Sequence, residues 1–178
     1  RKMFDLAGDD VISFGLGEPD FQPPNVAIEA FYQAMKDGHN KYTTTAGLPA
    51  LRQQIAESWS DYQDGLNSDN VCITMSGTNA ILNLFLTLVN PGDNVLIPEP
   101  YFPLYGPDAK LCGGDAKYYP CRFEDEFVPK VENLEQLIDE NTVAILYNFP
   151  SNPTGGTLNT GQRDALLNFA KKHDLWII

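Results

Sequence analysis

The chain has 178 residues, of which 43% are hydrophobic and 11% aromatic, so it can bury the core of a globular domain. Its formal net charge of −12 disfavours binding to nucleic acid or to an anionic membrane surface, because a polyanion would be repelled. The three cysteines contain no Cys-x-x-Cys pair and the two histidines lie far apart, which argues against a disulfide framework or a metal site and favours a reducing, cytoplasmic compartment.

Two features of the ends suggest a longer protein. The sequence begins with Arg1 and not with Met, and it stops at Ile178, inside an apolar segment that has the character of a buried strand. We therefore expect the chain to be an N-terminal fragment, with a sheet that is incomplete at its C-terminal side.

Residues 1–66 are expected to form an N-terminal arm and helices. Alternating apolar and polar residues predict a short strand over 11–14, and a glycine-rich loop follows it. Apolar residues at helical spacing predict one helix from Val26 to Gly38 and another from Leu48 to about Tyr62. The polar loop between them contains Tyr42, whose ring has no assigned role at this stage beyond packing on its own neighbours.

Residues 67–178 alternate strand and helix patterns, which is typical of an α/β fold with a mostly parallel sheet between two layers of helices. The expected elements are a strand over 71–75, a helix over 78–89, a strand over 94–97, a helix over 101–111, a strand over 116–119, a helix over 131–138, a strand over 142–146, a helix over 160–173 and a last strand from 175. We therefore predict a three-layer αβα domain.

The loop after the first of these strands leads directly into a helix. Ser76, Gly77 and Thr78 would place two hydroxyl groups and the unpaired backbone N–H groups of a helix N-terminus at the carboxyl edge of the sheet. Such an arrangement can hold a phosphate without a lysine. The same residues would also suit an ordinary helix N-cap, and the pattern alone leaves both interpretations open.

Two further strands end in residues that could serve the same site. Tyr101 and Phe102 follow the second strand between prolines, and a fixed aromatic ring there could stack on a flat ligand. Asn152 follows the strand over 142–146, between Pro150 and Pro153 and before two glycines, so its amide would be held in place; the alternative is a simple chain reversal. Because open α/β sheets bind ligands at this edge, the three segments together indicate a phosphorylated planar cofactor.

Nucleotide-binding motifs are missing from these turns. The loop at Ser76 lacks the Gly-x-Gly-x-x-Gly pattern of dinucleotide-binding folds, and the chain has no Gly-x-x-x-x-Gly-Lys-Ser/Thr loop for a nucleoside triphosphate. The cofactor is therefore not expected to be a nucleotide.

The chain resembles the fold-type I pyridoxal phosphate (PLP) enzymes and, among them, the class I aminotransferases of the aspartate and aromatic type. Three segments carry the resemblance: Gly-Glu-Pro-Asp-Phe at 17–21, Tyr-x-x-x-x-Gly-x-x-x-Leu-Arg at 42–52, and Asn-Pro-Thr-Gly at 152–155. They occur in the family's order and extend over most of the chain. The implied activity is transfer of an amino group between an L-amino acid and a 2-oxo acid.

The resemblance implies a role for each matching residue. Ser76, Gly77 and Thr78 match the loop that holds the cofactor phosphate. Phe102 matches the aromatic residue that stacks on the pyridine ring, and Asn152 the asparagine that binds the phenolic oxygen of the cofactor, at the edge of the substrate site. Gly17 matches a glycine beside the substrate carboxylate, and Tyr42 a tyrosine that reaches the phosphate of the neighbouring subunit, which implies a homodimer with shared active sites.

The chain contains no match for three other residues of the family. The Schiff-base lysine, the aspartate that pairs with the pyridine nitrogen and the arginine that binds the substrate α-carboxylate are all expected beyond Ile178, so no catalytic lysine is assigned here and the fragment alone is expected to be inactive. Two other functions share the fold. One is a PLP-binding sensor domain of a transcriptional regulator, and the other is a PLP-dependent β-lyase.

Overall fold

The computed structural model describes residues 11, 12, 15, 17 and 19–178. They divide into two compact units, one up to Thr45 and one from Ala46 to Ile178. The functional boundary expected between residues 66 and 67 stays a prediction.

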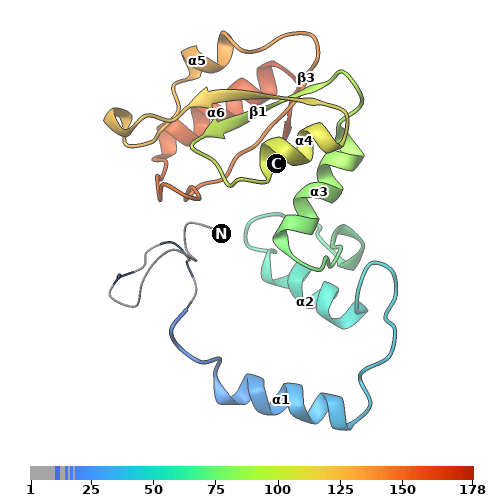
Figure 1. Ribbon diagram of the computed structural model, residues 1–178. Helices are drawn as coiled ribbons and strands as arrows, with labels where there is room; N and C mark the ends of the chain where they lie inside the picture. Colours follow the sequence, from blue (N-terminus) through green and yellow to red (C-terminus); the bar gives the residue numbers. More distant parts are fainter. Residues whose placement is uncertain (1–10, 13–14, 16, 18) are drawn as a thin grey trace. The chain divides into compact units, whose positions relative to one another are not determined.

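The first unit contains α1, Asn25–Lys36 (Figure 1). The helix follows Pro24 and ends just before Gly38, whose φ of +83° suits a residue without a side chain, as the pattern predicted. Val11 and Ile12 do not form a strand, whereas Ser13 and Phe14 lie outside the described residues.

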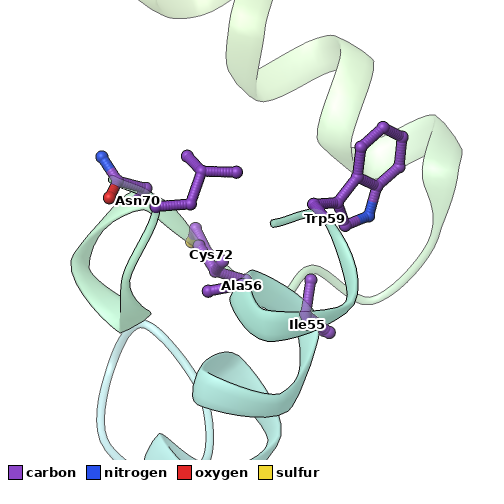
Figure 2. A pocket seen from close by; sticks show the side chains of 7 residues that line it. Ile55, Ala56, Trp59, Asn70 and Cys72 are labelled. Atoms are coloured by element: carbon purple, nitrogen blue, oxygen red, sulfur yellow. The ribbon is translucent and has the colours of Figure 1, made fainter. Parts of the chain in front are cut away.

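The second unit begins with α2, Pro49–Ser58, which the Arg52 side chain ties to the following segment. Arg52 Nε donates to the carbonyl of Val71 at 2.7 Å, and its Nη2 donates to the carbonyl of Ser68 at 2.6 Å. Ser68 opens the short 3-10 helix η1, Ser68–Asn70. A pocket of about 290 Å³ lies between α2 and this segment (Figure 2), lined by Ile55, Ala56, Trp59, Leu66, Asn70, Val71 and Cys72.

The strand predicted over 71–75 is wrong. Val71 has extended backbone angles, but none of these residues joins the ladder of the described sheet. The Ile73 N–H instead donates to the carbonyl of Ala46 at 2.9 Å. The local sequence has the residue types of a strand, but a strand also requires a partner, and the described residues supply none for this segment.

The sheet has four strands, all parallel, in the order β2-β1-β3-β4 (Figure 1). They are β1, Asn94–Glu99; β2, Asp115–Pro120; β3, Thr142–Ile145; and β4, Trp176–Ile177. These four match the remaining strand predictions. In the register, Ile97 faces Tyr118 across β1 and β2, and Leu96 faces Ile145 across β1 and β3.

The helices after η1 follow the predicted order. They are α3, Gly77–Leu88; α4, Tyr105–Leu111; α5, Val131–Glu135; and α6, Thr160–Lys172, with the 3-10 turn η2, Phe123–Asp125, before α5. Helix α4 begins at Tyr105 and not at 101, because the residue before a proline, here Phe102 before Pro103, is disfavoured in helical conformation. In the described part of the chain, no helix is both long and apolar enough to cross a membrane.

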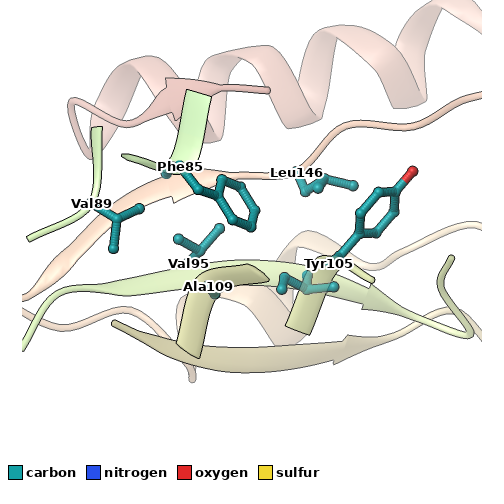
Figure 3. Packing of buried hydrophobic residues seen from close by; sticks show 8 residues of the cluster. Phe85, Val89, Val95, Tyr105, Ala109 and Leu146 are labelled. Carbon is teal, nitrogen blue, oxygen red and sulfur yellow. The ribbon is translucent and has the colours of Figure 1, made fainter. Parts of the chain in front are cut away.

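Two cores, one on each face of the sheet, show the three-layer αβα architecture. Because side chains alternate along a strand, Val95 and Ile97 of β1 face one core and Leu96 faces the other. The core on the α3 and α4 side contains Phe85, Val89, Val95, Ile97, Tyr105, Ala109, Ala144 and Leu146 (Figure 3). The core on the α5 and α6 side contains Leu96, Tyr119, Cys121, Leu134, Ile145, Leu166, Phe169 and Ala170.

A polar network joins the strands at their amino ends. Asp139 accepts hydrogen bonds from Lys117 Nζ and, at 2.8 Å, from the Asn94 side chain. These two partners, Lys117 first, hold the pKa of the Asp139 carboxyl well below its usual range. The network lies at the end of the sheet opposite to the strand ends that were predicted to bind a ligand.

Gly47 offers a test of how α2 is held to the 71–75 segment. Its φ is +102°, and a Cβ there would lie 2.5 Å from Ile73 Cγ1, whereas Gly65 has a φ of +79° with nothing within 4 Å of such a Cβ. We expect Gly65→Ala to cost about 1–2 kcal/mol through backbone strain alone. Gly47→Ala should cost about 1–3 kcal/mol more, because Ile73 must move as well.

Urea unfolding of the full-length protein measures both variants, with Gly65→Ala as the matched control. Equal destabilisation by the two substitutions would contradict the contact between Gly47 and Ile73.

Candidate functional site

A pocket of about 160 Å³ opens at the carboxyl edge of the parallel sheet. It is formed by one residue of α3, the first residue of α4, and the residues that follow β3 and β4: Ile81, Tyr105, Leu146, Tyr147, Asn148 and Ile178. The ladder continues past the strand ends here, since the Leu146 N–H donates to the Leu96 carbonyl at 2.9 Å and the Ile178 N–H to the Ile145 carbonyl at 3.0 Å. Segments far apart in the sequence therefore meet at this edge.

The N-terminus of α3 is compatible with both interpretations that the sequence left open, a helix N-cap and a phosphate site. Ser76 is the N-cap, and its Oγ accepts the N–H of Asn79 at 3.2 Å. The backbone N–H groups of Gly77 and Thr78 have no acceptor among the described residues, and the side chains of Ser76 and Thr78 are exposed. A Cβ on Gly77 would meet nothing within 4 Å, so the space in front of these donors is open. Helix capping by Ser76 thus leaves two amides available for an anion.

The two aromatic residues after β1 have different surroundings. The ring of Tyr101 stacks on Tyr118 with a centroid distance of 5.0 Å and an interplanar angle of 19°, and their hydroxyl oxygens are 3.3 Å apart. This hydrogen bond raises the pKa of Tyr101. Gly106 lies beside the pair, where any side chain would collide with the Tyr118 hydroxyl. Both the ring and the hydroxyl of Tyr101 thus already have Tyr118 as a partner. Phe102 is half-buried, and its ring packs against that of Tyr105, which lines the pocket, with 5.5 Å between the ring centroids.

The turn that contains Asn152 is closed by backbone hydrogen bonds. The Gly155 N–H donates to the carbonyl of Ser151 at 2.7 Å, and the Ser151 N–H to the carbonyl of Gly156 at 2.9 Å. Gly155 has a φ of +72°, which favours glycine, and a Cβ on Gly156 would lie 3.1 Å from Phe127 Cβ, which is tighter than an ordinary van der Waals contact. The Asn152 side chain is exposed and forms no hydrogen bond to any described residue.

The predicted site residues differ in how they relate to the pocket. Phe102 packs directly against the pocket wall, Ser76 to Thr78 begin the helix that supplies Ile81, and Asn152 lies four positions beyond Asn148 of the pocket. Gly17 and Tyr42 are exposed residues of the first unit, so their roles stay predictions.

Sequence reasoning missed Tyr105 and Asn148. Each follows a strand end by a few residues, which is the one signal that could have identified it.

These side chains and amides fit a phosphorylated aromatic ligand. The donor set at α3 consists of two free N–H groups, two hydroxyls and the positive end of a 12-residue helix, which is the chemistry that a phosphate requires. The pocket, which α3 lines with Ile81 one turn further on, is walled by aliphatic and aromatic side chains and includes Asn148. Together, the two parts suit a molecule with an anionic group and a flat, partly polar ring.

Comparison with known proteins supplies the family. The sequence profile described as aminotransferase class I and II matches residues 9–178. The chain is 35% identical to the aspartate aminotransferase of Pyrococcus horikoshii over 181 residues, which covers 100% of this chain and 46% of that protein. It is 37% identical to the aspartate aminotransferase of Geobacillus stearothermophilus, covering 99% of this chain and 45% of that protein.

Solved structures that match the chain are also aminotransferases. The aspartate aminotransferase of Thermotoga maritima superimposes with a TM-score of 0.90 at 33% identity, over 99% of this chain and 47% of that one. A maleate-bound aspartate aminotransferase of Thermus thermophilus gives a TM-score of 0.86 at 32% identity, over 91% of this chain and 43% of that one. The chain thus spans about half the length of the curated relatives that it matches. Since the family profile extends over residues 9–178, the chain belongs to the class I and II aminotransferases, and the cofactor of the class I enzymes is PLP, as the sequence predicted.

Proposed function

We propose that the full-length protein is a PLP-dependent aminotransferase that transfers an amino group between an L-amino acid and a 2-oxo acid. The observation that carries this proposal is the pair of free amides at Gly77 and Thr78, one turn before Ile81 of an aromatic-walled pocket at the carboxyl edge of the parallel sheet, in a member of this family. When bound, PLP supplies an aldehyde that combines with amino groups and a ring that accepts electrons. The residues of this chain bind and orient it.

The phosphate is assigned to the start of α3. The Gly77 and Thr78 N–H groups and the Thr78 hydroxyl donate to its oxygens, and the helix dipole stabilises its charge. The Ser76 hydroxyl can donate to the phosphate while its oxygen still accepts the Asn79 N–H, because a hydroxyl is both donor and acceptor. An acidic chain can thereby bind an anion without a basic side chain in this part of the site.

The ring is assigned to Phe102 and Asn152. Phe102 is held against Tyr105 and offers its face for stacking, which limits the ring to one plane. The Asn152 amide, free of other partners in the described structure, donates to the phenolic oxygen of the ring and favours its ionised form. Both residues would contribute by positioning the ring.

The first unit is assigned to the substrate and to the partner subunit. We infer that Gly17, which has no side chain, lies against the substrate carboxylate, and that Tyr42 reaches the phosphate of a neighbouring subunit in a homodimer. The full exposure of Tyr42 in the single chain is compatible with that contact. A cytoplasmic location is proposed from the three free, scattered cysteines.

The other two functions considered from the sequence are less well supported. The relatives described above are named aspartate aminotransferases, which favours amino-group transfer over a β-lyase reaction or a sensor without turnover.

A product analysis separates these functions. We expect the full-length protein with PLP to convert 2-oxoglutarate to glutamate when aspartate or an aromatic amino acid is the donor. Chromatography of the products, with omission of the 2-oxo acid as control, makes the measurement. Release of ammonia and pyruvate without glutamate would indicate a lyase, and PLP binding without any product would indicate a sensor; either result would contradict the proposal.

Two substitutions at α3 test the helix cap and the phosphate site, and only Ser76→Ala affects the cap. Ser76→Ala removes the cap and should lower the stability of the cofactor-free protein by about 1 kcal/mol. Thr78→Val removes a hydroxyl that has no partner in the described structure, so its effect on stability should stay within about 0.5 kcal/mol. It should nevertheless weaken PLP binding about ten- to a hundredfold, because a hydrogen bond to a charged group is lost.

Urea unfolding measures the stabilities, and titration of the dialysed full-length protein with PLP, followed by absorbance, measures the affinities. PLP affinity unchanged in Thr78→Val would remove this hydroxyl from the phosphate site.

A further inference from the structure

Tyr105 is the first residue of α4 and stands between the core and the carboxyl-edge pocket. Its side chain is only 6% exposed, and it packs in the core with Val95, Ala109 and Leu146. Figure 3 shows its ring directed away from Ala109, with the hydroxyl at the far end, beside Leu146. Tyr105 also lines the pocket of about 160 Å³ together with Tyr147 and Asn148.

The hydroxyl of Tyr105 has no hydrogen-bond partner among the described residues. The neighbouring tyrosines differ in this respect. Tyr119 donates its hydroxyl to the Leu146 carbonyl at 2.8 Å, and the hydroxyls of Tyr101 and Tyr118 pair at 3.3 Å. The Tyr105 ring is thus fixed in the core while its hydroxyl is unpaired at the wall of a pocket, so the hydroxyl is available to a polar group that enters there.

The protonation state suits a hydrogen-bond donor. Burial raises the pKa of Tyr105 above its ordinary value of 10.0, so the hydroxyl keeps its proton at neutral pH. It can therefore donate to a nitrogen or oxygen atom that enters the pocket.

The ring of Tyr105 has a second contact, with the aromatic residue proposed to stack on the cofactor. The centroids of Tyr105 and Phe102 are 5.5 Å apart, with an interplanar angle of 60°, and the Tyr105 N–H donates to the Phe102 carbonyl at 3.2 Å. Tilted pairs at this separation attract each other beyond the area that they bury. The Tyr105 ring therefore holds Phe102 from the core side.

We propose that Tyr105 is a further cofactor-binding residue, whose hydroxyl donates a hydrogen bond to an acceptor atom on the edge of the planar ring while its own ring fixes Phe102. This inference rests on the proposed function, since it assumes that the pocket receives the PLP ring. It adds a polar contact from α4 to those that the sequence placed at the start of α3 and after β1 and β3.

Tyr105→Phe tests the hydroxyl alone in the full-length protein. Titration of the dialysed protein with PLP should show about three- to tenfold weaker binding, which corresponds to one lost hydrogen bond. The pH at which the absorbance band of the bound cofactor changes should shift as well, because the ring loses a donor. Tyr118→Phe deletes the same atom from a tyrosine whose hydroxyl pairs with Tyr101, so it should leave both quantities unchanged.

Tyr105→Leu is the second variant, and it should weaken PLP binding further than Tyr105→Phe because it also removes the support of Phe102. Thermal unfolding of the cofactor-free variants verifies that both are folded. If the wild-type protein binds PLP and Tyr105→Phe shows the same affinity and the same pH titration, the role of the hydroxyl is overturned. Absence of PLP binding by the wild-type protein would instead overturn the proposed function, and this inference with it.

Discussion

The structure depends on the parallel pairing of β1 with β2 on one side and with β3 on the other. Val95, Leu96 and Ile97 of β1 are completely buried, and their alternating side chains serve both cores, so this strand holds the two helical layers to one sheet. Because all four strands run in the same direction, their carboxyl ends meet at one edge. The polar network of Asn94, Lys117 and Asp139 joins the strands at the other edge and leaves the carboxyl edge open for a ligand.

The proposed site uses backbone groups where an acidic protein lacks basic side chains. With a formal net charge of −12, the chain would repel a phosphorylated ligand over most of its surface. The start of α3 offsets this repulsion locally through free amides and the helix dipole, and the open space at Gly77 gives a phosphate access to them. Aromatic contacts around Phe102 and Tyr105 then supply the orientation that charge alone cannot give.

Much of the fold and part of the candidate site could be predicted from local patterns. The strand at 94–97 and the helices α3 and α6 follow directly from apolar spacing and flanking polar residues. The strand at 71–75 was wrong because pairing is a long-range property that strand-forming residue types do not ensure. Tyr105 was missed since nothing local distinguishes a tyrosine with a free hydroxyl from Tyr119, whose hydroxyl has a partner. The roles proposed for Gly17 and Tyr42 involve a substrate and a second subunit, which no local pattern describes.

The most direct test of the account is a crystal structure of the full-length protein with PLP bound. We expect the phosphate within about 3 Å of the Gly77 and Thr78 amide nitrogens, with the ring stacked on Phe102 and its phenolic oxygen bonded to the Asn152 amide. A cofactor whose phosphate lies away from the start of α3, or whose ring does not contact Phe102, would contradict the assignment of this edge of the sheet as the active site.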